Sequence, residues 1–248
     1  MRKSALRFLI LTVLYQVACG LFGQNVYVQQ RSTWSEARQY CRQHHTDLTS
    51  VDTTEEIIAL LLEAQKKDLV LPNMWIGLYK DVNHTWKWSG GTNMSHQFWP
   101  GLADITEDNL CVAIDRTQWK LKDCEKQKFP FWCFESQLVL VKENKTWEEA
   151  MEHCRHLDKE LVSLPSKSAL IQALQSSRTV QTDRVWIALR YLANTWLWMD
   201  GSTVKDKMWK QRKRSQCPEW RHHCGALSQE EEQLDSWDCA DTLNFLCY

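Results

Sequence analysis

Cysteine is the residue type with the most chemical potential in this sequence, because a thiol can form a disulfide, bind a metal ion or act as a nucleophile. Ten cysteines occur among 248 residues. Eight of them form two series, which are Cys41, Cys111, Cys124 and Cys133, and then Cys154, Cys224, Cys239 and Cys247. Matching members lie 113 to 115 residues apart, so the same arrangement of four cysteines occurs twice.

Zinc binding and catalysis are two alternatives for such cysteines. The segment CPEWRHHC, from Cys217 to Cys224, combines thiols with imidazoles, which are zinc ligands, but its spacing matches no standard zinc finger. We therefore interpret its two histidines as exposed loop side chains. No nucleophile, base and orienting group can be assembled from spacing, and we expect no enzymatic activity.

The N-terminus predicts a redox environment in which disulfides form. Basic residues precede an apolar run from Phe8 to about Ala18, which indicates a secretory signal peptide over residues 1–23. Its VACG also resembles a bacterial lipobox, but Gln16 stands where an aliphatic residue is needed. No other stretch approaches the length of a membrane span. We expect a secreted, extracellular chain whose cysteines pair.

Cys217 has no counterpart in the other series. Such a thiol in a secreted protein favours either an intermolecular disulfide, and hence a covalent dimer or partner link, or a buried or capped group. Three N-glycosylation motifs, at Asn83, Asn93 and Asn144, are consistent with the surface of a secreted protein.

The charge balance excludes one class of partner. A net charge of -1 and a pI near 6.7 give no electrostatic basis for binding nucleic acid. The local exception is the run KDKMWKQRKRSQ, from Lys205 to Gln216. It is either a solvated loop, a contact surface for anionic partners such as sulfated or sialylated glycans or an acidic protein face, or a processing site at RKR.

The elements that position these residues are also written twice. WIGLYKDVNHTWKWSGGT, from Trp75, and WIALRYLANTWLWMDGST, from Trp186, lie 111 residues apart. That period exceeds any solenoid repeat and matches a whole domain. We predict one domain over residues 24–136 and a second over residues 137–248, joined by a short linker.

Each copy predicts two helices and several short strands. Thr33 with Glu36, and Thr146 with Glu149, form capping boxes at helix starts, and the following Trp, Ala and Cys share one buried face. Second helices are expected near Thr53 to Gln65 and Ser166 to Gln175. Strands are expected at VYVQQ, WIGLY, CVAI, WKLKDC and FPFWC, and at LVLVKE, WIALR, CGAL and LNFLC, with TWKW and TWLW as turns.

Two long stretches have little regular pattern, from Gly90 to Leu110 and from Gly201 to His223. Loops of this length are usually functional or disordered. They are our candidates for ligand contact, whereas the tryptophans of the repeated stretches are interpreted as core.

Several of these motifs, in fixed order, resemble the C-type lectin-like domain, twice over and across nearly all of the mature chain. They are W-x-E-A-x-x-x-C at Trp34 and Trp147, WIGL and WIAL, W-x-W before a glycine turn, and the endings FPFWC and NFLCY. The chain is similar to proteins of the multi-domain mannose-receptor type. The resemblance implies an α+β fold in which each domain has two helices, two small antiparallel sheets and a long loop held by disulfides.

The resemblance also implies which cysteines pair, because four cysteines alone allow three connectivities. The implied pairs are Cys41 with Cys133, Cys111 with Cys124, Cys154 with Cys247, and Cys224 with Cys239.

Lectins of this family hold calcium, and through it a sugar, with oxygen ligands from a loop tripeptide, a later acid and an Asn-Asp pair. In the first copy these positions are Leu102, Ala103, Asp104, Asn109, Lys120 and Leu121, three of them apolar and one cationic. In the second copy they are Cys217, Pro218, Glu219, His222, Asp235 and Ser236, with Asp238 as a substitute. We expect no cofactor in the first domain, and Glu219 with Asp235 leave calcium open in the second.

We therefore expect a secreted recognition protein that binds an extracellular carbohydrate or glycoprotein through its long loops without the calcium mechanism of the family. Aromatic and arginine side chains dominate binding hot spots, and the candidate contacts are Met208, Trp209, Arg212, Arg214, Glu219, Trp220 and Asp235. Two alternatives remain, which are calcium-dependent sugar binding by the second domain, and a protein-binding or inhibitor module that forms a disulfide-linked oligomer.

Overall fold

The computed structural model describes residues 22–51, 53–66, 73–94, 105, 107–115, 118–204, 209 and 221–248. The chain divides between Ser136 and Gln137 into two compact units, called unit 1 and unit 2 below. The predicted signal peptide lies outside the described residues except for its last two positions, Phe22 and Gly23. Among the described residues, no helix is both long enough and apolar enough to cross a membrane.

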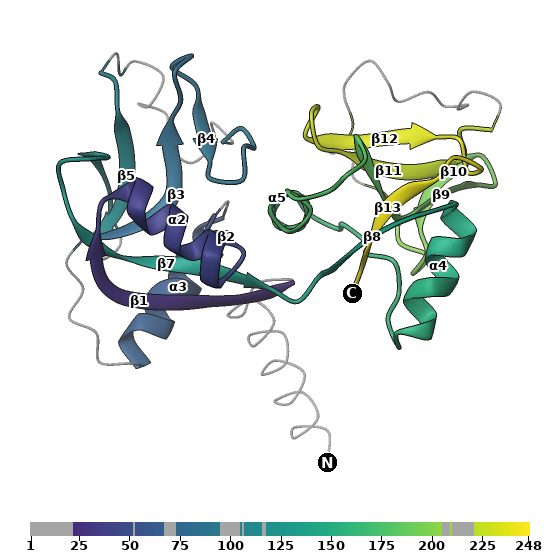
Figure 1. Ribbon diagram of the computed structural model, residues 1–248, viewed down its shortest axis with the longest axis horizontal. Helices are drawn as coiled ribbons and strands as arrows, with labels where there is room; N and C mark the ends of the chain where they lie inside the picture. Colours follow the sequence, from purple (N-terminus) through teal and green to yellow (C-terminus); the bar gives the residue numbers. More distant parts are fainter. Residues whose placement is uncertain are drawn as a thin grey trace. The chain divides into compact units, whose positions relative to one another are not determined.

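The described residues of unit 1 form two helices and one sheet of seven strands (Figure 1). The helices are α2 (Trp34–His44) and α3 (Thr54–Lys66). The strands are β1 (Gly23–Ser32), β2 (Asp47–Leu48), β3 (Met74–Lys80), β4 (Trp86–Trp88), β5 (Leu110–Asp115), β6 (Gln118–Asp123) and β7 (Phe129–Ser136). Their order is β1-β7-β3-β5-β6, with β2 paired to β7 and β4 paired to β3.

Unit 2 repeats this plan with six strands in the part of it that is described. The helices are α4 (Trp147–His156) and α5 (Lys167–Ser176). The strands are β8 (Val139–Lys145), β9 (Arg184–Leu192), β10 (Thr195–Trp198), β11 (Cys224–Ser228), β12 (Gln233–Trp237) and β13 (Leu243–Cys247). The order is β12-β11-β9-β13-β8, with β10 paired to β9, and Figure 1 shows α4 lying along one side of these strands.

The predicted α+β class with two helices in each unit is confirmed within the described residues. The strands expected in two small antiparallel sheets are linked into one sheet per unit by a short parallel contact. In unit 1 that contact joins β3 to β7 at Trp75 and Phe131, and in unit 2 it joins β9 to β13. The sequence does not predict this contact, because one or two paired residues are too few to produce a recognisable pattern.

Three local predictions needed correction. TWKW and TWLW are not turns, since β4 and β10 pair with the strand before them and form hairpins. Strand β2, with two residues, and strand β12 were not expected. Strand β12 has the sequence QLDSW, in which polar residues interrupt the apolar alternation that would have predicted a strand.

The first helix of each unit begins as its capping box predicts. The hydroxyl of Thr33 accepts from the backbone N–H of Glu36, whose carboxylate accepts from the backbone N–H of Thr33. Thr146 and Glu149 do the same in α4. Each helix therefore starts at a tryptophan that it directs into the core.

Four tryptophans of the two cores, two in each unit, donate their indole N–H groups to backbone carbonyls. The indole N–H of Trp34 donates to the carbonyl of Ile76 at 2.8 Å, and that of Trp147 donates to Ile187 at 2.9 Å. Trp75 and Trp186 are fully buried, and they donate to the carbonyls at the end of the first strand, Ser32 and Lys145. These four tryptophans are therefore packing residues, because each joins a helix or strand to a partner far along the chain.

The eight described cysteines form four disulfides that stabilise these cores, two in each unit. The pairs are Cys41–Cys133, Cys111–Cys124, Cys154–Cys247 and Cys224–Cys239, which are those that the resemblance implies. The first and third join the first helix to the last strand, and the second and fourth lie next to the end of the long stretch of each unit.

Candidate functional site

Of the seven predicted contact residues, two belong to the described part of the chain. Met208, Arg212, Arg214, Glu219 and Trp220 lie outside the described residues, as does the unmatched Cys217. Trp209 and Asp235 are described, and both belong to the side of unit 2 where the long stretch meets the sheet.

Trp209 is mostly buried, with 8% of its surface exposed. Its ring centre lies 5.1 Å from that of Trp196 in β10, and its backbone forms a bridge with Leu234 of β12. The aromatic side chain therefore joins the long stretch to the sheet, which leaves little of its face for a ligand.

Asp235 is also buried, with 3% of its surface exposed. Its carboxylate accepts from Nε of Arg184 at 3.0 Å, and an Nη of the same guanidinium lies 3.0 Å away. The guanidinium lies 4.0 Å above the ring of Trp237. A carboxylate with such a partner is already neutralised by a fixed cation.

The calcium ligands that the resemblance implies do not fit a metal in the described part of unit 2. A metal ion would have to compete with Arg184 for Asp235, and His222 packs its ring against Trp237 at 6.0 Å. The tripeptide Cys217, Pro218 and Glu219 lies outside the described residues. No group of three or more His, Cys, Asp or Glu side chains in the described ranges is placed to hold a metal ion.

In unit 1 a lysine, Lys120, stands at the strand position that Asp235 has in unit 2. Lys120 is paired with Ala113, as Asp235 is paired with Ala226, so the two residues stand at equivalent positions of β6 and β12. The ammonium of Lys120 forms an ion pair with Asp115. Leu121 follows it in the strand, and Leu102, Ala103 and Asp104 lie outside the described residues. A cation and an apolar side chain stand where metal ligands are needed.

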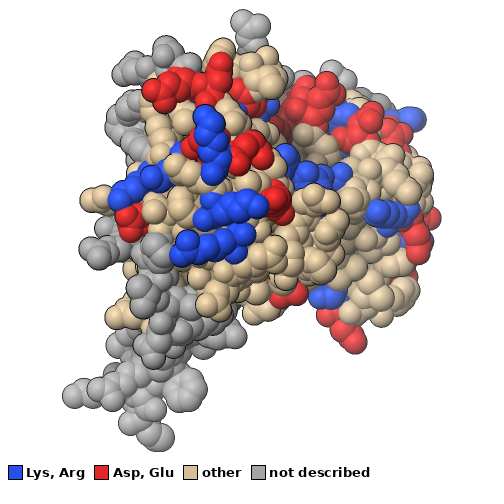
Figure 2. All heavy atoms as spheres, turned by 60° about the vertical axis from the view of Figure 1, so that its left-hand side comes forward, with Lys and Arg blue, Asp and Glu red and all other residues tan. Residues whose placement is uncertain are grey.

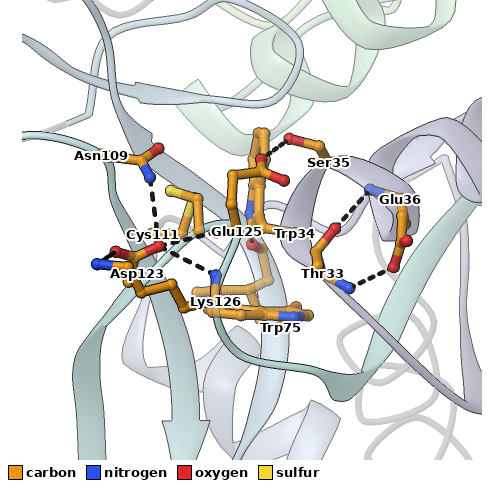
Figure 3. The surroundings of a disulfide bond; sticks show 12 residues. Thr33, Trp34, Ser35, Glu36, Trp75, Asn109, Cys111, Asp123, Glu125 and Lys126 are labelled. Carbon is orange, nitrogen blue, oxygen red and sulfur yellow. Dashed lines mark hydrogen bonds and ion pairs between the residues drawn. A yellow bond between two sulfur atoms is a disulfide. The ribbon is translucent and has the colours of Figure 1, made fainter.

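The end of the long stretch in unit 1 is ordered by Asp123, beside the Cys111–Cys124 disulfide (Figure 3). Its carboxylate accepts from the amide of Asn109 at 3.3 Å and from the backbone N–H groups of Glu125 and Lys126 at 3.0 and 3.1 Å. The Glu125 N–H, and after it the Lys126 side chain, hold the pKa of Asp123 below its usual value. Asn109, predicted at a ligand position, serves this turn.

The same end in unit 2 is held by aromatic rings. The rings of Tyr191 and His223 stack with their centres 5.8 Å apart, and Tyr191 also packs on Trp196 at 5.4 Å. This corrects our interpretation of the two loop histidines as exposed, because His222 and His223 are each half-buried against an aromatic neighbour. Their neighbours, Tyr191 in β9 and Trp237 in β12, could not be inferred from the sequence of the segment CPEWRHHC alone.

The charged side chains of the surface are mixed in sign. Figure 2 shows Lys and Arg interspersed with Asp and Glu on the face that it presents. In unit 1, ion pairs join Lys126 to Asp123 and Lys128 to Glu36. The glycosylation motifs are accessible, since Asn83, Asn93 and Asn144 are all exposed.

Sequence reasoning missed two residues that contact these regions, Arg184, which pairs with Asp235, and Lys80, which donates to the carbonyls of Ile105 and Glu107. Arg184 lies two residues before Trp186, and Lys80 ends the first WIGLYK strand. A comparison of the two repeats could have signalled both, since a charged residue stands in one copy where the other has Asn73 or Tyr191.

Comparisons with known proteins agree with this plan. A family model described as Lectin C-type domain matches residues 30–134 and residues 143–248. The secretory phospholipase A2 receptor of Oryctolagus cuniculus is 25% identical over 264 residues, covering 87% of this chain and 17% of the receptor. Lymphocyte antigen 75 of Homo sapiens is 27% identical over 228 residues, covering 76% and 13%. C-type mannose receptor 2 of Rattus norvegicus is 24% identical over 263 residues, covering 89% and 18%. The chain spans less than a fifth of each relative's length.

Proposed function

The chain belongs to the C-type lectin domain family, as its repeated motifs predict, and from this premise we propose that it is a recognition protein that binds a carbohydrate or glycoprotein ligand without calcium. Domains of this family are typically non-enzymatic, and in general they recognise carbohydrates or glycoproteins. Binding through the long loops, secretion and the absence of the metal from the mechanism are the specific parts of this proposal.

One observation supports the calcium-independent part, and it is the ion pair at the same strand position of both units. Asp235 faces Arg184, and Lys120 faces Asp115, where the resemblance places metal ligands. Calcium needs about six to eight oxygen ligands. A guanidinium that already occupies one carboxylate, and an ammonium in place of another, oppose the arrival of a divalent cation by charge repulsion.

The long loops are the proposed contact region because the sheet holds their ends. In unit 1 the loop end is held by Asp123, and in unit 2 by the rings of Tyr191, Trp196 and Trp209. We propose that Met208, Arg212, Arg214, Glu219 and Trp220 contact the ligand from the long stretch of unit 2. In this proposal Trp209 and Asp235 mainly support the loop and do not contact the ligand, since both are buried.

Two domains in one chain can raise overall affinity when both engage one ligand, because the second binding event becomes intramolecular. The two loops differ in sequence and in how they are held, which favours two different binding sites over one duplicated site.

The first experiment is binding of the purified chain to a broad glycan array, with calcium and again with a chelator. We expect the same glycans to be bound in both conditions. Binding that disappears on chelation would contradict the proposal and support calcium-dependent binding by unit 2. An array without any bound glycan, together with capture of a protein partner that sugars do not compete, would favour the protein-binding alternative.

A pair of variants tests whether Arg184 is the sole barrier to a metal ion. Replacing Arg184 with Met removes the guanidinium and leaves the Asp235 carboxylate without this partner, whereas Arg155→Met removes an exposed guanidinium of the same unit. We expect neither variant to make binding calcium-dependent at ordinary affinity, because one carboxylate does not complete the ligand set.

A further inference from the structure

Lys80 is a buried lysine whose ammonium contacts the long loop of unit 1. Only 7% of its surface is exposed, although it carries a charge and ends strand β3. Its Nζ donates to the carbonyl oxygen of Ile105 at 2.8 Å and to that of Glu107 at 2.7 Å. Both carbonyls belong to the last part of the stretch that runs from Gly90 to Leu110. One side chain thus connects the hairpin β3–β4 to the end of the loop.

The burial of this ammonium requires compensation. Removing a charged group from water is strongly unfavourable unless the group is hydrogen-bonded or paired. Hydrogen bonds from a charged donor are shorter and stronger than those between neutral groups. The two short contacts to Ile105 and Glu107 therefore stabilise the ammonium and, equally, the backbone geometry of the loop that offers the carbonyls.

Unit 2 uses different chemistry at the same position. Lys80 stands opposite Trp86 in the β3–β4 hairpin, and Tyr191 stands opposite Trp196 in the β9–β10 hairpin. Tyr191 packs on Trp196 and stacks on His223, and Trp209 packs on Trp196 from the long stretch. The position thus contacts the loop in both units, through an ammonium in one and through aromatic rings in the other.

We propose that Lys80 is a positioning residue for the ligand loop of unit 1, and that its ammonium serves as a covalently attached cation for the carbonyls of residues 105 and 107. A bound hard cation organises backbone carbonyls in the same way, so this part of the loop keeps its geometry without a metal ion. The functional meaning of this role rests on the proposed use of the long loops, but the positioning itself does not need a ligand to be measured.

The test measures local opening of the loop by proteolysis of the full chain. Glutamyl endopeptidase cleaves after Glu107, whose side chain is exposed, once the surrounding backbone opens. Lys80→Met removes the ammonium and keeps most of the apolar stem, and Lys80→Ala removes both. We expect each variant to be cleaved after Glu107 at least about tenfold faster than the wild type, the size expected from the loss of a hydrogen bond to a charged group.

The matched control is Lys87→Met in the next strand of the same hairpin. Lys87 forms an ion pair with Asp81 at 3.2 Å, and its side chain is 30% exposed. We expect Lys87→Met to leave cleavage after Glu107 unchanged. Cleavage after Glu36, within helix α2, reports global unfolding in every variant and should stay slow.

Chemical rescue separates the charge from packing. n-Propylammonium replaces the atoms that Lys80→Ala removes, and tetramethylammonium supplies charge without an N–H donor. We expect the first to slow cleavage of Lys80→Ala toward the wild-type rate and the second to have no effect, each compared with wild type in the same salt. Wild-type cleavage rates in both Lys80 variants, equal acceleration in Lys87→Met, or no rescue by n-propylammonium would overturn the proposal.

These outcomes are independent of the glycan experiment. The cleavage assay contains no ligand, so a failure to bind glycans leaves the role of Lys80 intact, and unchanged cleavage leaves the calcium-independent binding intact.

Discussion

At the scale of single residues, the two units place the same ion pair in opposite environments. Asp47 is completely buried, accepts from Nε and an Nη of Arg42 at 3.3 and 3.2 Å, and is also bonded by the hydroxyl of Ser89. The equivalent pair in unit 2 joins Arg155 to Glu160, with 54% and 64% of the side chains exposed. The contribution to stability should therefore differ strongly.

We predict that Asp47→Asn lowers the free energy of unfolding by about 3 kcal/mol, because it removes the charged acceptor that Arg42 and Ser89 share at the fully buried Asp47. Glu160→Gln should change the value by less than about 0.5 kcal/mol, because exposed pairs contribute little. Urea unfolding of the full chain with its disulfides intact measures both. Equal effects of the two substitutions would contradict the importance of burial.

At the scale of elements, the capping boxes make both first helices sensitive to acid. The backbone N–H of Thr33 holds the pKa of Glu36 below its ordinary value, and the backbone N–H of Thr146 does the same for Glu149. A lowered pKa in the folded state means that the ionised carboxylate favours folding. This stabilisation is present above the ordinary pKa of 4.5 and is lost as the pH falls through the lowered value.

We predict that a Glu36→Ala, Glu149→Ala variant is less stable than the wild type at neutral pH and loses less stability on acidification below about pH 4.5. The measurement is the midpoint of urea unfolding at several pH values. Glu152→Ala, at an exposed position of α4, is the matched control. A double variant whose acid dependence equals that of the wild type would show that the boxes do not carry this effect.

At the scale of the whole molecule, two copies of one fold carry different loops on similar cores. The cores repeat the tryptophans and the disulfides, and the differences gather at Lys80 against Tyr191 and at Lys120 against Asp235. Such a distribution fits a family in which a conserved scaffold presents variable recognition loops. Secretion, N-glycosylation and a covalent dimer through Cys217 are the proposals that belong to this scale.

We predict that the chain, expressed in a eukaryotic secretory system, appears in the medium and loses mass when N-glycans are removed, since Asn83, Asn93 and Asn144 are exposed. Electrophoresis without reductant should show a doubled mass that Cys217→Ser abolishes. The control is Cys217→Ser under reducing conditions, which should match the reduced wild type. A monomer without reductant would contradict the dimer, and retention in the cells would contradict secretion.

The sequence by itself determined those features that depend on neighbouring residues or on repetition. The capping boxes at Thr33 and Thr146 are visible because their partners lie three residues apart. The two units are visible because matching cysteines and tryptophans recur at a nearly constant offset. The family resemblance then supplied the disulfide pairs, which spacing leaves open among three connectivities.

Only the tertiary structure decided which charges meet. Arg184 reaches Asp235 across 51 residues, and Lys80 reaches the carbonyls of Ile105 and Glu107 across 25 and 27 residues. These partners depend on how the strands and the loop assemble, and a shift of one residue in register turns a strand side chain to the other face of the sheet. Local patterns do not encode that register, so the candidate site became visible only once the strands were assembled.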